Sequence, residues 1–197
     1  AINYTNDLSK ALAVYKVDMV IVAVAESSIL DVVIGLKDFK GLILLEKPVG
    51  KNLNEYHQIS RIAAEHKLRI RVALNRRFYS SVKALRSMCD EKSFLVQDQQ
   101  GPSEFPKHRL EAIGKRNIPY ANSIHLIDTV CFLASAEKYE ILEPISIVSS
   151  GFYTARVLFN DKQEMTYVLA WDIPGPWAIS CYDKNYYSDL RPLERLV

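Results

Sequence analysis

Glycine is scarce in this sequence, with 7 residues in 197, whereas ordinary usage is about 7%. No GxG sequence occurs anywhere in the chain. Dinucleotide-binding folds hold a pyrophosphate at a glycine-rich turn before a helix, because backbone N–H groups must approach the phosphates closely. The chain therefore has no sequence signal for a phosphate-binding loop.

Cysteine is also rare, and its spacing excludes two classes of small scaffold. Cys89, Cys131 and Cys181 are odd in number and far apart, with no CxxC or Cys/His ligand spacing. This pattern argues against a disulfide framework and against a zinc site, and we predict no metal. A reducing, cytoplasmic setting is the one that the cysteines favour.

Charge and hydropathy exclude further classes. The chain has 25 Lys+Arg and 23 Asp+Glu, a formal net charge of +2, and no basic run. That balance argues against a nucleic-acid partner. No apolar run reaches the roughly 18 residues of a spanning helix, and no signal-peptide pattern is visible, so no membrane association is predicted.

The first part of the chain alternates apolar strands with amphipathic helices. The run at 18–24 is continuously apolar and β-branched, which is typical of a strand buried on both faces of a parallel sheet. The predicted order is helix 8–15, strand 18–24, helix 27–39, strand 41–45, helix 52–66, strand 68–75 and helix 79–91. This βαβ series predicts a parallel sheet with right-handed crossovers.

The pattern changes after about residue 92. Residues 97–119 are predicted to be a loop with a short helix at 106–112, followed by a helix at 122–134. Strands are then predicted at 141–149, 151–160, 163–173 and 177–184, with a hairpin turn at 160–163. The fold class predicted is α/β: the C-terminal half of a Rossmann-type parallel-sheet domain (1–78), followed by an α+β domain with an open antiparallel sheet (79–197).

The later strands also predict an oligomer. Between 151 and 184, apolar and polar residues alternate, with several aromatic residues among them: Phe152, Tyr153, Phe159, Tyr167 and Trp171. A large flat apolar sheet face rarely stays in water. We therefore expect a homo-oligomer formed through the antiparallel sheet.

Glu46-Lys47-Pro48 follows a predicted buried strand. Ligands of open α/β sheets bind outside the carboxyl ends of the strands, and a partly desolvated lysine there can act as a general acid or base. The alternative is a solvated lysine in an ordinary βα turn, which the tripeptide alone does not exclude.

His125 and Asp128 lie at positions i and i+3 of the predicted helix 122–134, so they share a face. An imidazole oriented by a carboxylate is a proton shuttle. The alternative is a surface histidine with an acidic neighbour. We interpret His57 and His66, on the earlier helix, as surface residues.

Asn75-Arg76-Arg77-Phe78 follows the third predicted strand, at the same sheet edge as Lys47. Arginines at that edge can hold an anion or a carboxamide. They can equally be surface charges that lead into the next helix. The sequence leaves both interpretations open.

Taken in order, these motifs resemble a known family. The run at 20–24, then Glu46-Lys47-Pro48-Val49, then Asn75-Arg76-Arg77-Phe78, then residues 122–128 are similar to the glucose–fructose oxidoreductase / inositol dehydrogenase (Gfo/Idh/MocA) family. The resemblance covers nearly the whole chain. It implies a two-domain oxidoreductase that uses NAD or NADP and acts on a sugar-type small molecule such as a cyclitol, sugar or nucleotide sugar.

The resemblance also implies site residues. Lys47 and His125 would be catalytic. Residues that would line the cofactor are Ala23, Val24, Glu26, Glu46, Lys47, Asn75 and Arg76. Residues that would contact the substrate are Lys47, Tyr120, Asn122, His125 and Asp128.

The chain departs from the family pattern at three places. It lacks the glycine-rich loop, which family members carry ahead of the first strand found here, so we expect an internal portion of a longer protein. Ala121 stands where family members often have an acid, and Ile29 where they often have a histidine. These departures motivate an alternative, a catalytically silent member that acts as a binding or assembly subunit. A plain interaction domain is a more distant third, because it would not explain Lys47 and His125.

Overall fold

The computed structural model describes residues 4–88, 93–100, 119–149, 151–171 and 173–197. It divides into two compact units, Ala1–Leu74 with Glu111–Asn122 and Asn75–Leu110 with Ser123–Val197. The predicted helix at 106–112 lies outside the described residues. Within the described ranges, no helix combines the length and the apolar character needed to cross a bilayer.

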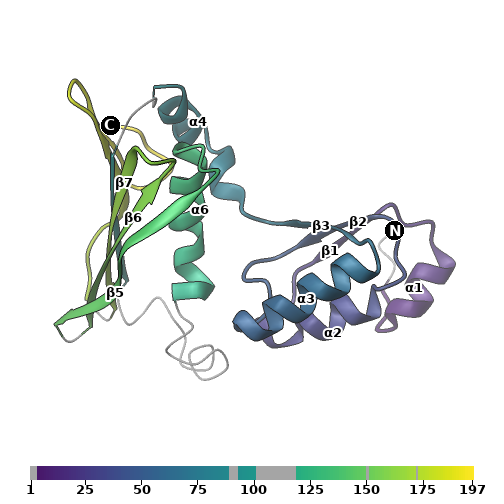
Figure 1. Ribbon diagram of the computed structural model, residues 1–197. Helices are drawn as coiled ribbons and strands as arrows, with labels where there is room; N and C mark the ends of the chain where they lie inside the picture. The colour runs from purple at the N-terminus through teal and green to yellow at the C-terminus, as the bar shows by residue number, and fades with distance from the viewer. Residues whose placement is uncertain (1–3, 89–92, 101–118, 150, 172) are drawn as a thin grey trace. The chain divides into compact units, whose positions relative to one another are not determined.

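The first unit is built on a three-stranded parallel sheet in the order β1-β2-β3, which confirms the predicted βαβ series (Figure 1). Its strands are β1 Met19–Val22, β2 Leu42–Leu45 and β3 Arg69–Val72. Its helices are α1 Leu8–Val14, the short 3₁₀ helix η1 Glu26–Ser28, α2 Ile29–Gly35 and α3 Leu53–Glu65. The helix α3 begins where the sequence predicts, because the Asn52 side chain accepts a hydrogen bond from the Glu55 backbone N–H at 3.0 Å.

Helices α2 and α3 cover one face of this sheet (Figure 1). The core between them is made of buried aliphatic side chains: Val22, Ile29, Val33, Leu36, Ile43, Leu45 and Ile59. On the edge strand β1, by contrast, Met19 is 48% exposed and Ile21 is 61% exposed. The apolar run at 18–24 predicts a strand that is buried on both faces. Within the described residues, only one face of that strand, β1, is covered.

The second unit holds a six-stranded sheet in the order β5-β6-β7-β4-β8-β9. Its strands are β4 Ser93–Gln100, β5 Tyr139–Ser149, β6 Phe152–Phe159, β7 Gln163–Trp171, β8 Trp177–Tyr182 and β9 Tyr187–Leu190. Its helices are η2 Asn75–Phe78, α4 Ser80–Ser87 and α6 Ile124–Leu133, and the π-helical turn η5 Pro119–Ser123 leads into α6. Helices α4 and α6 pack on one face of the sheet through Val82, Leu85, Leu126 and Val130.

Three features of this sheet differ from the sequence prediction. Strand β4 lies where a loop from residue 97 is predicted, and β9 lies beyond the last predicted strand. Strand β4 also pairs with β7 in parallel, so the sheet is mixed rather than antiparallel. The physical reason for missing β4 is that its inward side ends in Asp98 and Gln100, both buried, which breaks the apolar alternation.

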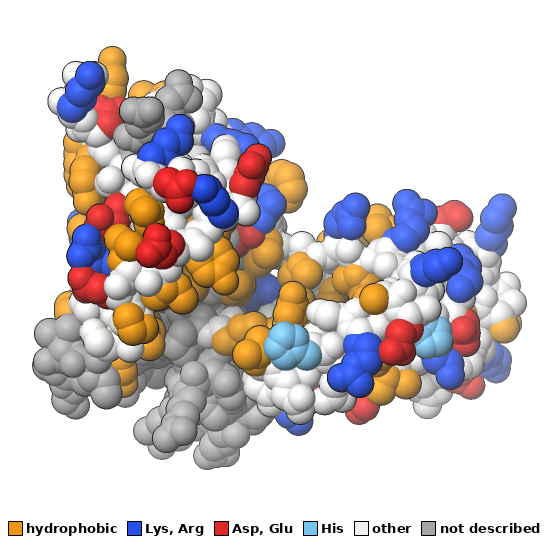
Figure 2. All heavy atoms as spheres, viewed as in Figure 1, with side chains coloured by type: hydrophobic (Ala, Val, Ile, Leu, Met, Phe, Trp, Pro, Cys, Tyr) orange, Lys and Arg blue, Asp and Glu red, His pale blue; other side chains and the backbone are white. Residues whose placement is uncertain are grey.

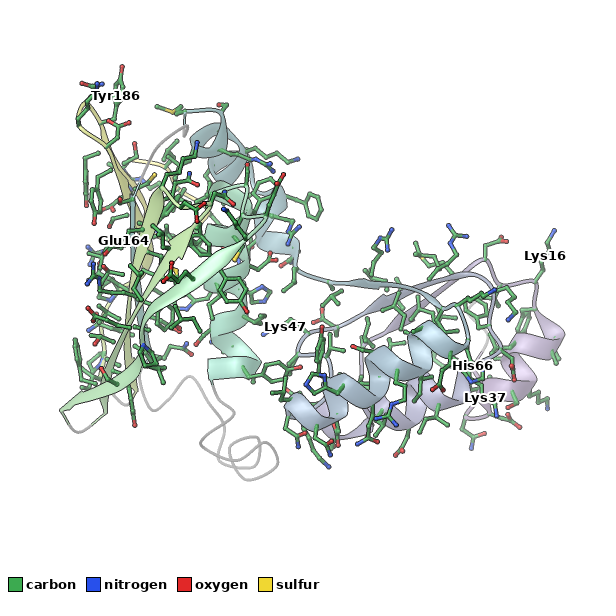
Figure 3. All side chains as sticks on the ribbon, viewed as in Figure 1. Lys16, Lys37, Lys47, His66, Glu164 and Tyr186 are labelled. Atoms are coloured by element: carbon green, nitrogen blue, oxygen red, sulfur yellow. The ribbon has the colours of Figure 1, made fainter. Side chains whose placement is uncertain are left out.

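The open face of the sheet is also less apolar than predicted. Tyr153, Phe159 and Tyr167 face the helix-covered core instead of the open side. The open side carries an ion-pair network, in which Arg156 donates from Nη1 to Glu143 Oε1 at 2.6 Å and from Nε to Glu164 Oε1 at 2.7 Å (Glu164 is labelled in Figure 3). The predicted aromatic surface is therefore wrong for these three residues.

Charged side chains are spread over the surface. On the face shown in Figure 2, basic and acidic groups are interspersed with hydrophobic ones over both units. This distribution agrees with the near-balanced composition of the chain.

Candidate functional site

The turn that follows β2 carries Lys47. The Glu46 backbone N–H donates to the Val22 carbonyl at 2.9 Å, so Glu46 extends the β1–β2 ladder by one residue. The Glu46 carboxylate then accepts from the Lys47 backbone N–H at 3.0 Å. The Lys47–Pro48 peptide bond is cis. Lys47 thus leaves the sheet at its carboxyl edge, as the sequence predicts.

The Lys47 ammonium is bound to a distant segment of the same unit. Its Nζ donates to the backbone carbonyl of Ala121 at 3.1 Å and to Asn122 Oδ1 at 3.5 Å (Lys47 is labelled in Figure 3). Ala121 is 1% exposed, so its carbonyl is shielded from water. Lys47 is therefore a partly buried, oriented ammonium and not a freely solvated lysine.

The rest of the turn is held rigidly. Gly50 has a φ of 86°, and a Cβ there would lie 2.8 Å from Glu55 Cβ, so only glycine fits this position without displacement. The Glu55 carboxylate accepts from the Lys51 backbone N–H at 2.9 Å and pairs with Lys51 Nζ at 2.9 Å. Glu55 is 7% exposed. These contacts fix the path of the chain after Lys47.

Tyr120 adds a second link between the turn and the 119–122 segment. Its hydroxyl donates to the Val49 carbonyl at 2.8 Å. Burial, with smaller contributions from Tyr56 and Glu55, raises the pKa of Tyr120 to about 12. The phenol therefore remains a donor at neutral pH. Tyr120 supports the Lys47 turn from the side.

In the second unit, His125 and Asp128 lie on the first turns of α6. His125 is 8% exposed and Asp128 is 9% exposed, so both are buried and the surface-histidine alternative is excluded. Asp128 forms a bidentate ion pair with Arg77, whose Nε donates to Oδ2 at 3.0 Å while Nη2 donates to Oδ1. The hydrogen bond that Arg77 donates to Asp128 raises the pKa of Arg77. The carboxylate predicted to orient His125 is thus bound to an arginine.

Arg76 and Arg77 both make contacts within the second unit. Arg76 Nη1 donates to Glu194 Oε1 at 2.6 Å and to the Tyr79 hydroxyl, and its guanidinium lies 5.5 Å from the centroid of Trp177. The sequence left open whether these arginines hold an anion or are surface charges. The structure shows protein partners for both of them.

The remaining predicted cofactor residues lie at the ends of strands. Ala23 and Val24 follow β1 and are exposed, Glu26 begins η1 and is half-buried, and Asn75 begins η2 and is exposed. Ala23 and Val24, the first residues after β1, have small or apolar side chains. They fit a nicotinamide ring, whereas no GxG turn in the sequence fits a pyrophosphate.

Sequence reasoning missed the groups that position Lys47. The partner that Ala121 provides is a backbone carbonyl, which no side-chain type reveals, and Ala121 lies 74 residues after Lys47 in the chain. The Val49 carbonyl, which accepts the hydrogen bond from the Tyr120 hydroxyl, could not be predicted from the sequence for the same reason. Asn122 could be found from the sequence, because its amide lies in the motif that also contains His125.

Comparisons with known proteins agree with this architecture. No family model matches the sequence. The chain is 27% identical over 98 residues to YceM of Salmonella typhimurium, a protein whose name gives it only provisionally as an oxidoreductase. That match covers 48% of this chain and 29% of the length of YceM.

Several solved structures share the fold. The dehydrogenase MviM of Clostridium difficile has a TM-score of 0.73 at 17% identity, covering 97% of this chain and 65% of that one. UDP-N-acetylglucosamine 3-dehydrogenase GnnA of Acidithiobacillus ferrooxidans has a TM-score of 0.71 at 16% identity, covering 98% and 63%. The WlbA dehydrogenase of Bordetella pertussis, solved with NADH and UDP-GlcNAcA, has a TM-score of 0.70 at 12% identity, covering 97% and 65%.

This chain therefore has the two-part fold of these dehydrogenases. It spans less than two thirds of the length of each of the three. At these identities the likeness establishes the fold, and the chemistry must be argued from the residues.

Proposed function

We propose that these residues form the greater part of an NAD(P)-dependent oxidoreductase of the Gfo/Idh/MocA type, acting on a hydroxyl or carbonyl of a sugar, cyclitol or nucleotide sugar. The observation that carries the proposal is the pair of hydrogen bonds from Lys47 Nζ to Ala121 and Asn122. They tie the carboxyl edge of the parallel sheet to the segment that enters α6. His125 follows Asn122 by three residues.

The chemistry proposed needs one hydride acceptor and one proton acceptor. A bound nicotinamide would supply the hydride chemistry, as acceptor from a carbinol carbon or as donor to a carbonyl carbon. Lys47 binds the substrate oxygen and polarises it or moves its proton, and His125 is the partner acid or base, or orients the substrate. The Ala121 and Asn122 oxygens hold the ammonium in one direction, which lowers the entropic cost of binding substrate there.

We propose that Ala23, Val24, Glu26, Glu46 and Asn75 line the cofactor. Among the described residues β1 pairs with β2 alone, which supports a site beside β1 for a pyrophosphate-binding segment outside these 197 residues. A further parallel strand beside β1 would cover Met19 and Ile21, which are exposed here. A glycine-rich turn on such a strand would supply the backbone N–H groups that this sequence lacks.

One observation favours the alternative of a silent subunit. Family members often carry an acid at the position of Ala121, and here the Lys47 ammonium has a neutral backbone carbonyl from that residue instead. A carboxylate there would pair with Lys47 far more strongly than a carbonyl does. In the alternative, the same residues bind a sugar-type ligand without turning it over.

Two further parts of the proposal concern the oligomeric state of the protein and its location in the cell. We propose a homo-oligomer that uses the open face of the second-unit sheet. The ion-pair network of Arg156, Glu143 and Glu164 would then provide specificity instead of an aromatic surface. Because the cysteine pattern favours a reducing compartment, we also propose a cytoplasmic location.

The experiment begins with the coding sequence ahead of Ala1, where the proposal expects a GxGxxG turn after a strand. The full-length protein is then titrated with NADH and NADPH by calorimetry and screened with UDP-sugars, free sugars and inositols for change in absorbance at 340 nm. Micromolar cofactor binding with turnover supports the enzyme. Cofactor or sugar binding without turnover supports the silent subunit, and no binding of either contradicts both. The 197 residues alone should bind NADH weakly, and micromolar binding by them would show that the cofactor site is misplaced.

A further inference from the structure

The sheet of the first unit has two different faces. Strands β1, β2 and β3 are parallel and in register, so residues that pair across the strands point to the same face. One row, Val20, Ile43 and Ile70, packs in the core under α2 and α3 (Figure 1). The rows on either side of it point to the opposite face, and they are Met19–Leu42–Arg69 and Ile21–Leu44–Arg71.

Over β1 and β2, the face opposite α2 and α3 is apolar and incompletely covered among the described residues. Met19 and Ile21 on β1 are exposed, and Leu42 and Leu44 on the central strand are half-buried. Parallel sheets are normally covered by helices on both faces, because a contiguous apolar surface is unfavourable in water. A further strand beside β1 would contact the edge residues without lying above β2. This face therefore needs a layer of its own.

Over β3, the same face is basic. Arg69 and Arg71 are both exposed, and Arg71 Nη1 donates to the Ile70 carbonyl at 3.2 Å. In the part of the chain that the structure describes, no carboxylate lies within ion-pair distance of either guanidinium. A segment that covers this face should therefore be apolar over β1 and β2 and acidic over β3.

We propose that an amphipathic helix with acidic residues along one side, from a part of the full-length chain outside these 197 residues, covers this face. Neighbouring strands lie about 4.8 Å apart, so β1 and β3 are separated by about 10 Å, the diameter of one helix with its side chains. Arg69 and Arg71 lie about 6.6 Å apart along their strand, and positions i and i+4 of a helix lie about 6 Å apart along its axis. The covering helix should therefore carry two acidic residues four positions apart beside its apolar stripe.

The related structures support this source for the helix. The chain covers 65% of MviM and 63% of GnnA, so the remainder of each of those chains has no counterpart here. The inference rests on the proposed function only in taking the protein to be longer than these residues. A second copy of the chain is the competing occupant of the face, and the experiment distinguishes the two.

The first measurement is zero-length cross-linking of the full-length protein. R71K keeps the positive charge and offers an amine, which a carbodiimide joins to a carboxylate only where the two are in contact. The matched control is R61K, at an exposed arginine of α3, which packs on the other face of the sheet. Peptide mass spectrometry locates the joined carboxylate. A mixture of ¹⁴N- and ¹⁵N-labelled protein separates links within one chain from links between copies.

We expect the R71K amine to join an Asp or Glu outside these 197 residues and within the same chain, with a second acidic residue four positions away. The yield of this link should exceed the yield from R61K at least tenfold. Equal yields in the two variants, including no link in either, would overturn the proposal. A link between copies, or a link to a carboxylate of the 197 residues, would overturn it as well.

Thiol labelling measures the cover over the apolar rows. Ile21 and Leu53 are 61% and 64% exposed, so I21C and L53C should react at similar rates if nothing further covers β1. In the full-length protein we expect I21C to react at least tenfold more slowly, with rates read peptide by peptide so that the native cysteines do not interfere. R71E should speed I21C labelling about tenfold, because like charges at the contact weaken the docking of the helix. R61E should leave that rate unchanged.

Equal rates for I21C and L53C would overturn the proposal, and so would an I21C rate that R71E and R61E change alike. If R71E does not fold, the R71K link and the rate of I21C by itself decide. None of these measurements uses a cofactor or a substrate. If the cofactor titration fails, the proposed function fails, and cross-linking and labelling still decide what covers this face. If the cofactor binds and I21C reacts as fast as L53C, the proposal about this face fails by itself.

Discussion

The Lys47 ammonium lies 3.1 Å from the backbone carbonyl oxygen of Ala121, which follows it by 74 residues. This contact joins the turn after β2 to the segment that enters α6, and both belong to the same compact unit. A lysine that ends a strand and donates to a buried carbonyl has its direction fixed before any ligand arrives. That preorganisation is what a proton-transfer or polarising group needs.

The Tyr120 hydroxyl should stabilise the Lys47 turn in a pH-dependent way. The folded-state pKa of about 12 lies above the ordinary value of 10.0. Between these values the unfolded chain loses the Tyr120 proton and the folded chain keeps it, so this contribution is full below pH 10 and is lost as the pH rises toward 12. Y120F should cost about 1 kcal/mol at pH 8 and flatten the decline above pH 10.

Urea unfolding at pH 8 and at alkaline pH measures both effects. Tyr15→Phe is the control, because Tyr15 is 45% exposed in the same unit. Equal alkaline slopes for Y120F and the parent protein would contradict the assigned role of Tyr120.

The Arg77–Asp128 pair should be a strong contact within the second unit. Asp128 is buried and accepts two hydrogen bonds from the guanidinium. D128N and R77Q should each lower the free energy of unfolding by about 1–3 kcal/mol, because each leaves a charged partner unsatisfied. The double variant should cost less than the sum of the two. Additive losses in urea melts would show that the pair is not coupled.

Glu164 on the open sheet face should titrate below its usual range. The hydrogen bond and charge of Arg156 lower the pKa of Glu164. The stability gained from this pair is present above the unfolded pKa of Glu164 and is lost as the pH falls through the lower folded value. R156Q should therefore raise the pKa of Glu164, measured by ¹³C NMR of the side-chain carboxyl. K162Q, which removes an exposed charge two residues away, should leave that pKa nearly unchanged, and an equal shift in both variants would contradict the assignment.

The open face should form the contact between copies of the chain. Val168 lies on that face, paired with Thr154 of β6 and Gln97 of β4. V168R should convert an oligomer to a monomer, because an arginine in a packed interface is desolvated without a partner. Light scattering after gel filtration measures the mass, with L53R as a control at an exposed leucine of the first unit. A parent protein that is monomeric at micromolar concentration would remove the basis for this interface.

Much of the fold could be predicted from local patterns. The apolar runs that became β1 and β2, and the Asn52 cap of α3, depend on neighbours close in sequence. The Asn160-Asp161 turn was also predicted, and both residues have positive φ, 52° and 61°. Such features depend on a few neighbouring residues, so they can be predicted without a structure.

The parts that could not be predicted depend on contacts distant in sequence. Strand β4 was missed because its inward Asp98 and Gln100 look like loop residues until Tyr167 and Trp177 are placed beside them. The partner of Asp128 was also unforeseen, since Arg77 lies 51 residues earlier. The local sequence pattern does not indicate which distant side chains contact one another.

The most direct test of the central claim is the turnover of K47M in the full-length protein, measured as hydride transfer to or from the nicotinamide with the substrate found in the screen. The account predicts that kcat falls by about 10²-fold or more, the usual scale for losing a positioned acid or base. H57A, at an exposed helix residue, should leave kcat unchanged. A K47M protein with unchanged kcat would contradict the account.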